Sequence, residues 1–156
     1  MIVIAILGLI SSVSLLSVRT PLRAVRFSND VEKILALDGQ ARTRAGKGHS
    51  ARLQINARDD SIALVSTTTR RAQLSTRDII QSIHSDQDER DEDGNYLIRF
   101  GARGTSASYA IELASPRGNT TWLVVMGLTG ESYILNEPEW SHAQISKLLA
   151  PRPNAD

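Results

Sequence analysis

The sequence begins with an apolar segment that no charged residue interrupts. Ile2 to Val18 has the sequence IVIAILGLISSVSLLSV, and the first charged side chain is Arg19. As a helix rising about 1.5 Å per residue, this segment would be roughly 25 Å long, close to the thickness of a bilayer's hydrocarbon core. The pattern predicts a transmembrane or filament-core helix over residues 1–18. A cleaved signal peptide and a buried core helix are the two alternatives.

A second helix-forming stretch follows over residues 19–48. Pro21 is expected to kink or interrupt the helix, and one of the three residues at 28–30 to cap its continuation. Apolar residues then recur at helical spacing and form one stripe: Val31, Ile34, Leu35, Ala41 and Ala45. Gly46-Lys47-Gly48 is expected to end the helix. The sequence thus predicts an amphipathic helix that continues from the apolar segment into a soluble domain.

Over residues 49–137 the spacing of apolar residues changes from helical to alternating. Leu53 and Ile55 lie in a first strand, and the Asp59-Asp60 turn leads back into a second strand with Ile62 and Leu64. Further strands are expected at 79–83, 96–100, 107–113, 120–126 and 132–135, separated by glycine- and proline-containing turns. Residues 138–156 are expected to add a short helix over 141–149 and a flexible tail. The predicted fold is α+β, with the long N-terminal helix packed on an antiparallel meander.

Composition excludes several kinds of chemistry. The chain contains no cysteine, so disulfides and thiolate nucleophiles are ruled out, and its net charge of +1 gives no global attraction to nucleic acid. No pair among His49, His84 and His142 has the i, i+4 spacing of a metal-binding helix, and each is expected at the surface. Trp122 and Trp140 are interpreted as packing residues. The sequence therefore predicts no catalytic residue, no cofactor and no metal site.

Two charged regions leave alternatives open. Asp86 to Gly94, with the sequence DQDERDEDG, favours a solvated loop; the EF-hand pattern fails because Phe100 occupies the position of the bidentate glutamate. A different calcium site within Asp86–Asp93, or a protein-contact loop, are the alternatives. Basic residues cluster twice, at Arg19, Arg23 and Arg26 and again at Arg42, Arg44, Lys47 and Arg52. The first group suits lipid headgroups or neighbouring subunits. The second suits a solvated helix face, or else phosphate binding.

Three segments carry a resemblance to a known family. VIAILGLI, from Val3 to Ile10, is similar to the centre of the hydrophobic helix in type IV pilins and type II secretion pseudopilins. A helix that ends in QARTRAGKG (Gln40 to Gly48) before a hairpin resembles the GspH/FimT minor pseudopilins. So do Ile98 to Phe100, Gly104 to Ser106, and LVVMGLTG from Leu123 to Gly130. The resemblance implies a pilin-like fold.

The resemblance has one departure. Family members carry a glycine and an aromatic residue at the prepilin-peptidase site, followed shortly by a glutamate, all just upstream of the apolar string. None of these precedes Val3 here. We expect Met1 to be internal to the true reading frame, with prepilin-type cleavage and N-terminal methylation taking place upstream.

The resemblance implies a structural subunit of a type II secretion pseudopilus or a type IV pilus-like filament. Its partners would be other pilin or pseudopilin subunits, inner-membrane lipid before assembly, and exported cargo. The chain would cross the bacterial cytoplasmic membrane once, with its C-terminal domain periplasmic. The residues expected to form the membrane and assembly helix are Val3, Ile4, Ile6, Leu7, Gly8, Leu9, Ile10, Val13 and Leu16. A secreted or membrane-anchored β-rich binding module, and a DNA-binding minor pilin for DNA uptake, are the alternative functions.

Overall fold

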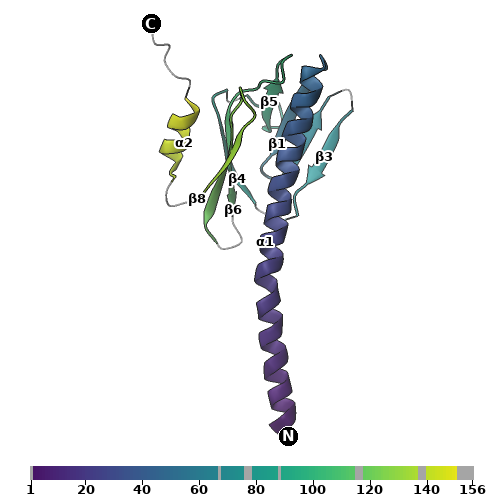
Figure 1. Ribbon diagram of the computed structural model, residues 1–156, viewed down its shortest axis with the longest axis vertical. Helices are drawn as coiled ribbons and strands as arrows, with labels where there is room; N and C mark the ends of the chain where they lie inside the picture. The colour runs from purple at the N-terminus through teal and green to yellow at the C-terminus, as the bar shows by residue number, and fades with distance from the viewer. Residues whose placement is uncertain are drawn as a thin grey trace.

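The computed structural model describes residues 2–66, 68–75, 79–87, 89–114, 118–136 and 140–150; within α1, side chains are described at Leu22 and from Ala24 onward. Figure 1 shows one helix running from the N-terminus into a β-domain, with a second, short helix near the C-terminus. The elements are α1 (Ile2–Gly46), β1 (Ala51–Asn56), β2 (Ser61–Val65), β3 (Arg70–Gln73), β4 (Ile80–Ser85), β5 (Tyr96–Phe100), β6 (Tyr109–Ala114), β7 (Thr120–Val125), β8 (Ser132–Asn136) and α2 (His142–Leu149).

The strands form two four-stranded antiparallel sheets. The first sheet has the order β3-β2-β1-β5 and the second the order β4-β6-β7-β8. The α+β class and the antiparallel pairing are therefore confirmed, with a helix packed on the sheets. The single meander expected from the sequence is wrong, because β5 returns to pair with β1 while β4 pairs with β6. Local alternation marks a strand but contains no information on which distant strand lies beside it.

The predicted β1–β2 hairpin is confirmed in register. Leu53 lies opposite Leu64, and Ile55 opposite Ile62. Asp60 in the connecting turn adopts a φ of 46°, the left-handed conformation that aspartate tolerates better than most residues. Strand β3 was not expected, because its sequence, RRAQ, has no apolar alternation and three of its four residues are exposed.

Helix α1 is continuous through Pro21, so the predicted interruption there is wrong. The cap expected at residues 28–30 is also wrong. Asp30 lies within the helix and is fully buried, and its Oδ1 accepts hydrogen bonds from the Ser75 backbone N–H (2.8 Å) and from Lys33 Nζ (2.9 Å). Its carboxylate ties α1 to the β-domain.

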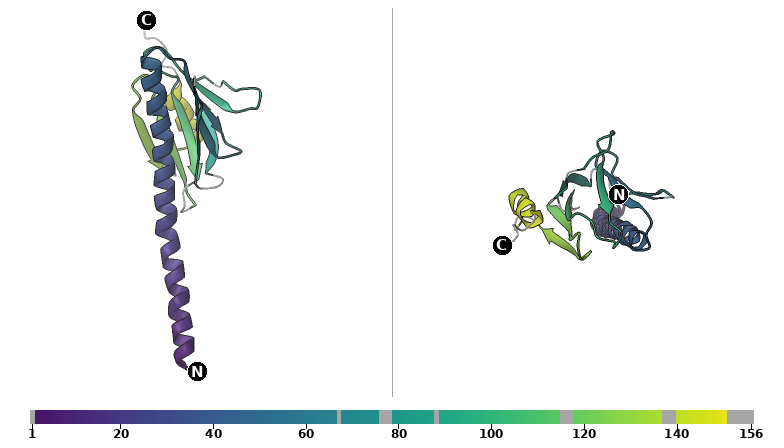
Figure 2. Two further views of the ribbon diagram at one scale, coloured as in Figure 1. Left: turned by 90° about the vertical axis from the view of Figure 1, so that its right-hand side faces the viewer. Right: turned by 90° about the horizontal axis from the view of Figure 1, so that it is seen from above.

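The main core lies between α1 and the inner faces of both sheets. From α1 it takes Val31, Ile34, Leu37, Ala41 and Ala45. The predicted stripe is thus correct except that Leu35 is only partly buried and Leu37 was missed. A second, smaller core forms on the opposite face of the second sheet, beneath α2: Ala110, Trp122, Val124, Ile145 and Leu149. Figure 2 shows α1 and α2 on opposite sides of this sheet.

Within the described residues, none of the helices combines the length and the apolarity needed to cross a membrane. The side chains of residues 1–21 lie outside the described ones. The nine residues from Val3 to Leu16 that are expected to form the membrane and assembly helix belong to that part, so their role stays a prediction.

Candidate functional site

The most elaborate polar arrangement joins α1 to the β-domain. Arg42 Nε donates to Asp38 Oδ2 at 2.6 Å, one helical turn earlier, and the Tyr109 hydroxyl donates to Asp38 Oδ1 at 2.9 Å. Arg42 Nη1 donates to the carbonyl oxygens of Gly104 (3.1 Å) and Gly127 (2.8 Å). Asp38 and Tyr109 are buried. We call Asp38, Arg42 and Tyr109, with the two carbonyl groups, the Arg42 clamp.

Two glycines make the clamp possible, because Gly104 brings backbone close to α1 and Gly127 brings its loop close to Ser106 and Ala107. Gly104 has a φ of +75°, and a Cβ there would lie 2.8 Å from the Arg42 carbonyl oxygen. A Cβ at Gly127 would overlap the Ser106 carbonyl. Because neither position has room for a side chain, the two loops can present their carbonyl oxygens to the guanidinium. The glycine-rich segments singled out in the sequence therefore have a structural role.

The clamp corrects the interpretation of the second basic cluster. Arg42 was expected on a solvated helix face, but its side chain is only 15% exposed and is neutralised by Asp38. Arg44 donates to the Ser66 hydroxyl, whereas Lys47 and Arg52 are exposed. The cluster is thus divided between buried and solvated positions and forms no continuous phosphate-binding surface. The i, i+4 spacing of Asp38 and Arg42 was the available signal, but it did not indicate burial.

Burial of the clamp affects the ionisation of Tyr109. Removal from water is the main cause that raises the pKa of the Tyr109 phenol well above its usual value, and the negative charge of Asp38 raises it further. The phenol therefore remains a hydrogen-bond donor to Asp38 throughout the physiological pH range. The clamp is built to hold two parts of the molecule together, with no group poised for proton transfer.

The acidic loop is organised around Asp91. Its Oδ1 accepts from the backbone N–H groups of Asp93 (3.0 Å) and Asn95 (2.8 Å), and its Oδ2 from the side chains of Gln54 (2.6 Å) and Asn95 (2.8 Å). The Asn95 side chain is the largest of the influences that lower the pKa of Asp91. Both oxygens thus serve to fold the loop onto β1, which leaves them few lone pairs for a cation. Asp88 lies outside the described residues.

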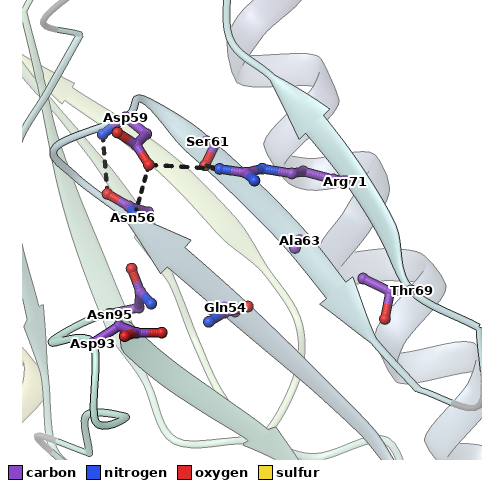
Figure 3. A pocket seen from close by; sticks show the side chains of 9 residues that line it. All are labelled: Gln54, Asn56, Asp59, Ser61, Ala63, Thr69, Arg71, Asp93 and Asn95. Carbon is purple, nitrogen blue, oxygen red and sulfur yellow. Dashed lines mark hydrogen bonds and ion pairs between the residues drawn. The ribbon is translucent and has the colours of Figure 1, made fainter.

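A shallow polar depression of about 420 Å³ lies on the outer face of the first sheet, beside this loop. Figure 3 shows its lining: Gln54, Asn56, Asp59, Ser61, Ala63, Thr69, Arg71, Asp93 and Asn95. Asp59 Oδ2 accepts from Asn56 Nδ2 at 3.1 Å and lies 3.6 Å from Arg71 Nη2, which donates to Ser61 Oγ at 2.9 Å. These groups largely satisfy one another. The depression was not predicted, because its residues come from four separate segments.

Two histidines meet at the start of α2, and no sequence pattern predicted that they would pair. His142 Nδ1 lies 3.2 Å from His84 Nε2, and His142 Nε2 lies 3.5 Å from Glu112 Oε1. The His142 ring meets Trp122 edge-on, with 4.9 Å between ring centroids. Glu112 also accepts from the Ser82 hydroxyl. His84 was expected at the surface in isolation, but it lies in β4 as part of this cluster.

The histidine cluster does not have the geometry of a metal centre. The carboxylate and His84 contact different nitrogens of the same His142 ring, so the three groups do not converge on one point. No group of three or more potential metal ligands is found among the described residues. The Trp122 indole N–H is buried and has no hydrogen-bond partner. The cluster is therefore best described as a contact through which the start of α2 packs on the second sheet.

Comparison with known proteins gives no neighbour from which a function could be transferred. No protein-family model matches the chain, and neither a curated protein nor a solved structure shows significant similarity to it.

Proposed function

We propose that this chain is a structural subunit of a pilus-like filament, of the minor pseudopilin type. In this proposal the apolar segment Ile2–Val18 packs against equivalent helices of other subunits. The segment holds the chain in the bacterial cytoplasmic membrane before assembly. The observation that carries the proposal is the continuity of α1, which joins this segment and the docking segment of the β-domain in one helix.

The exposed surface of α1 supports this role. Leu22 and Val25 are 50% and 56% exposed, although both are large and apolar. They lie between the apolar segment and Asp30, the first buried residue described on α1, and are interspersed with arginines. Apolar side chains on a helix that the β-domain leaves uncovered are suited to packing against a neighbouring helix.

The Arg42 clamp supports the same function mechanically. A filament subunit is held by its helix, so the β-domain must stay attached to that helix when neighbouring subunits push or pull on it. The clamp connects one turn of α1 to Tyr109 in β6 and to the loops that contain Gly104 and Gly127. These directional hydrogen bonds add to the apolar contacts of α1 and fix its orientation on the β-domain, because separating the two would leave the Tyr109 hydroxyl and the Gly104 and Gly127 carbonyl groups without these partners.

The absence of cysteine permits a direct test by disulfide crosslinking. Single-cysteine variants Ile6→Cys and Leu9→Cys are expressed in a bacterium from the full reading frame, together with the other pilin-like subunits of that host, each of which carries one cysteine in its own apolar helix. We expect the chain in the cytoplasmic-membrane fraction, and disulfide-linked complexes with those subunits after oxidation. Leu128→Cys, on the surface of the β-domain, is the control that should not trap helix-to-helix complexes.

Two results would contradict the proposal. The first is a mature chain in the soluble exported fraction whose N-terminus, measured by mass spectrometry, lies near residue 18; it would indicate a secreted binding module. The second is unchanged fractionation and crosslinking after the double substitution Leu9→Asp and Ile10→Asp. Two carboxylates in the middle of an apolar helix should prevent membrane insertion and helix packing, at a cost of about 2.5–3.5 kcal/mol each.

A further inference from the structure

Large apolar side chains are exposed around β8. Among the described residues, the exposed large apolar ones fall into two groups, one at Leu22 and Val25 on α1 and one around β8. The second group contains Leu128, Ile134, Tyr133 and Leu148, whose exposed fractions are 80%, 55%, 47% and 41%. Leu128, Tyr133 and Leu148 come from the β7–β8 loop, from β8 and from α2 and line one hollow, whereas Ile134, opposite Leu123 of the main core, lies on the other face of the sheet.

Leu128, Tyr133 and Leu148 lie around a groove. Helix α2 packs over β4 and β6 of the second sheet and leaves the β8 side of the same face open. The resulting hollow has a volume of about 440 Å³ and a mainly apolar lining: Ser108, Met126, Leu128, Thr129, Glu131, Tyr133, Leu135, Trp140 and Leu148. Tyr133 and Leu135 lie opposite Val124 and Trp122 in the register, which places them on the face that α2 covers. We call this hollow the β8 groove.

The β8 groove lies along an open sheet edge. In the part of the chain that the structure describes, β8 pairs with β7 alone, so every second N–H and C=O along its other side faces away from the sheet. Figures 1 and 2 show β8 at the margin of the second sheet, with no strand beyond it. An edge of this kind is a template for a further strand, and the groove beside it would receive that strand's apolar side chains.

The outer edge of the first sheet is different. Strand β3 begins with Arg70 and Arg71, and Arg70 Nη1 donates to Gln40 Oε1 of α1 at 3.0 Å. Arginines along an edge, one of them tied to a neighbouring helix, discourage pairing with another strand. Strand β8 has no charged residue between Ser132 and Asn136. The two edges thus differ in charge: β3 carries arginines that discourage an added strand, and β8 carries no charged residue.

We propose that β8 and the β8 groove bind an extended strand of another polypeptide, with apolar residues at alternate positions and a basic residue at the end that lies beside Glu131. Backbone hydrogen bonds to the β8 edge would supply the pairing, and the groove would bury the alternate side chains. The inference concerns the second sheet and α2, so it holds whether or not α1 assembles into a filament.

The charge next to β8 indicates which charged residues the partner strand should contain. Glu131 precedes β8, and its Oε2 accepts from the hydroxyl of Tyr133 at 3.0 Å. An acidic residue thus precedes an apolar strand, which favours lysine or arginine at the end of the bound segment that lies beside Glu131. Strand β8 itself contains no basic residue, so β8 of a second copy would bring no cation to Glu131 and is disfavoured as the partner.

A designed peptide tests the proposal with the full chain in detergent micelles. The probe is a ten-residue peptide of alternating valine and threonine with two lysines at each end. Binding is followed by NMR shifts of the β8 backbone amides. We expect saturable binding, with the largest shifts in β8 and the β7–β8 loop. The same peptide N-methylated at alternate residues should bind at least about tenfold more weakly, because it loses its hydrogen bonds to the edge.

Two substitutions give the proposal its controls. Leu128→Asp should weaken binding at least about tenfold, whereas Leu22→Asp, at an exposed leucine of α1, should leave it unchanged. Glu131→Lys should reduce the preference for lysine-flanked over glutamate-flanked peptides. Equal affinity for the N-methylated peptide would overturn strand addition. Concentration-dependent self-association abolished by Leu128→Asp would instead identify a second copy as the occupant and overturn the proposed partner.

Discussion

The two helices are attached to the β-domain in contrasting ways. Helix α1 combines a long apolar stripe with buried charges, and the Arg42 guanidinium binds two backbone carbonyl groups that lie 62 and 85 residues further along the chain. Helix α2 buries two apolar residues, Ile145 and Leu149, and meets the second sheet through a histidine pair at its start. The attachment of α1 joins distant parts of the chain. Helix α2 covers only part of one face of the second sheet.

The contrast indicates which part of the molecule is fixed and which can move. Displacing α1 would break the hydrogen bonds from Tyr109 to Asp38 and from Arg42 to two carbonyl groups, and it would expose the main core, so the β-domain and α1 should unfold together. Displacing α2 would uncover a small apolar surface and break contacts that are half exposed, and it should cost much less. The β8 groove lies beside the less firmly held helix, where adjustment to a partner strand is easiest.

The largest expected effect comes from breaking the clamp. Arg42→Met removes the guanidinium and leaves Asp38 buried beside Tyr109 with no cation, so the free energy of unfolding should fall by about 3–5 kcal/mol. Urea unfolding followed by circular dichroism measures this change. Lys47→Met, at an exposed position near the end of the same helix, is the matched control and should change stability by less than about 0.5 kcal/mol. Equal effects would show that the clamp adds nothing.

The close packing of the Gly127 loop against Ser106 can be tested separately from the charges of the clamp. Gly127→Ala places a methyl group against the Ser106 carbonyl, and overpacking of this kind costs about 1–3 kcal/mol or more. Gly39→Ala, in open space on α1, should instead raise stability by up to about 1 kcal/mol. Thermal unfolding of the two alanine variants should therefore shift in opposite directions. A neutral Gly127→Ala variant would mean that the Gly127 loop is free to move away from Ser106 and Ala107.

Shortening a buried side chain of α2 tests whether that helix can detach by itself. Ile145→Ala removes one of its two buried apolar residues, a change that costs about 2–5 kcal/mol in a core. We expect α2 to separate before the domain unfolds, so hydrogen exchange should become faster in α2 and stay unchanged in α1 and β1. Ile34→Ala in the main core is the comparison and should accelerate exchange throughout. Uniform acceleration in both variants would contradict the division into two cores.

Alkaline pH should weaken the α1 attachment through Tyr109. An unfolded tyrosine loses its proton near pH 10, whereas burial raises the pKa of Tyr109 in the folded chain. Above pH 10 the folded state therefore binds one more proton than the unfolded state, and stability falls by up to about 1.4 kcal/mol per pH unit. Denaturant midpoints from pH 9 to pH 11 measure the slope. Tyr109→Phe, although less stable at neutral pH, should lose this part of the slope.

Much of the fold could be predicted from local patterns. The β1–β2 hairpin, the short C-terminal helix and most of the apolar stripe on α1 follow from spacings within a few residues. Strand β3 could not be predicted, because its arginines follow no apolar alternation. The interruption expected at Pro21 is wrong, because α1 continues through it. The cap expected at residues 28–30 is wrong because local rules treat Asp30 as a helix start, whereas its carboxylate is bonded to Ser75 in the β-domain.

The candidate sites were less accessible to sequence reasoning. Arg42 was one of several basic residues on a helix, and nothing nearby in the sequence showed that Gly104 and Gly127 would approach it. His84 and His142 lie 58 residues apart and meet only because α2 folds back over β4. The β8 groove similarly depends on α2 leaving one side of a sheet uncovered. Each of these sites is a product of the packing of whole elements.

The sequence by itself determined the apolar segment Ile2–Val18, the positions of most helices and strands, and the α+β class, because these depend on hydrophobic periodicity along short stretches. Only the tertiary structure decided how the strands divide into two sheets, how α1 is clamped to the glycine loops, and which sheet edge stays open. Those outcomes depend on contacts such as the one between Asp38 and Tyr109, 71 residues apart. The free energy of such a contact is available only after both partners have been brought together by the packing of everything around them.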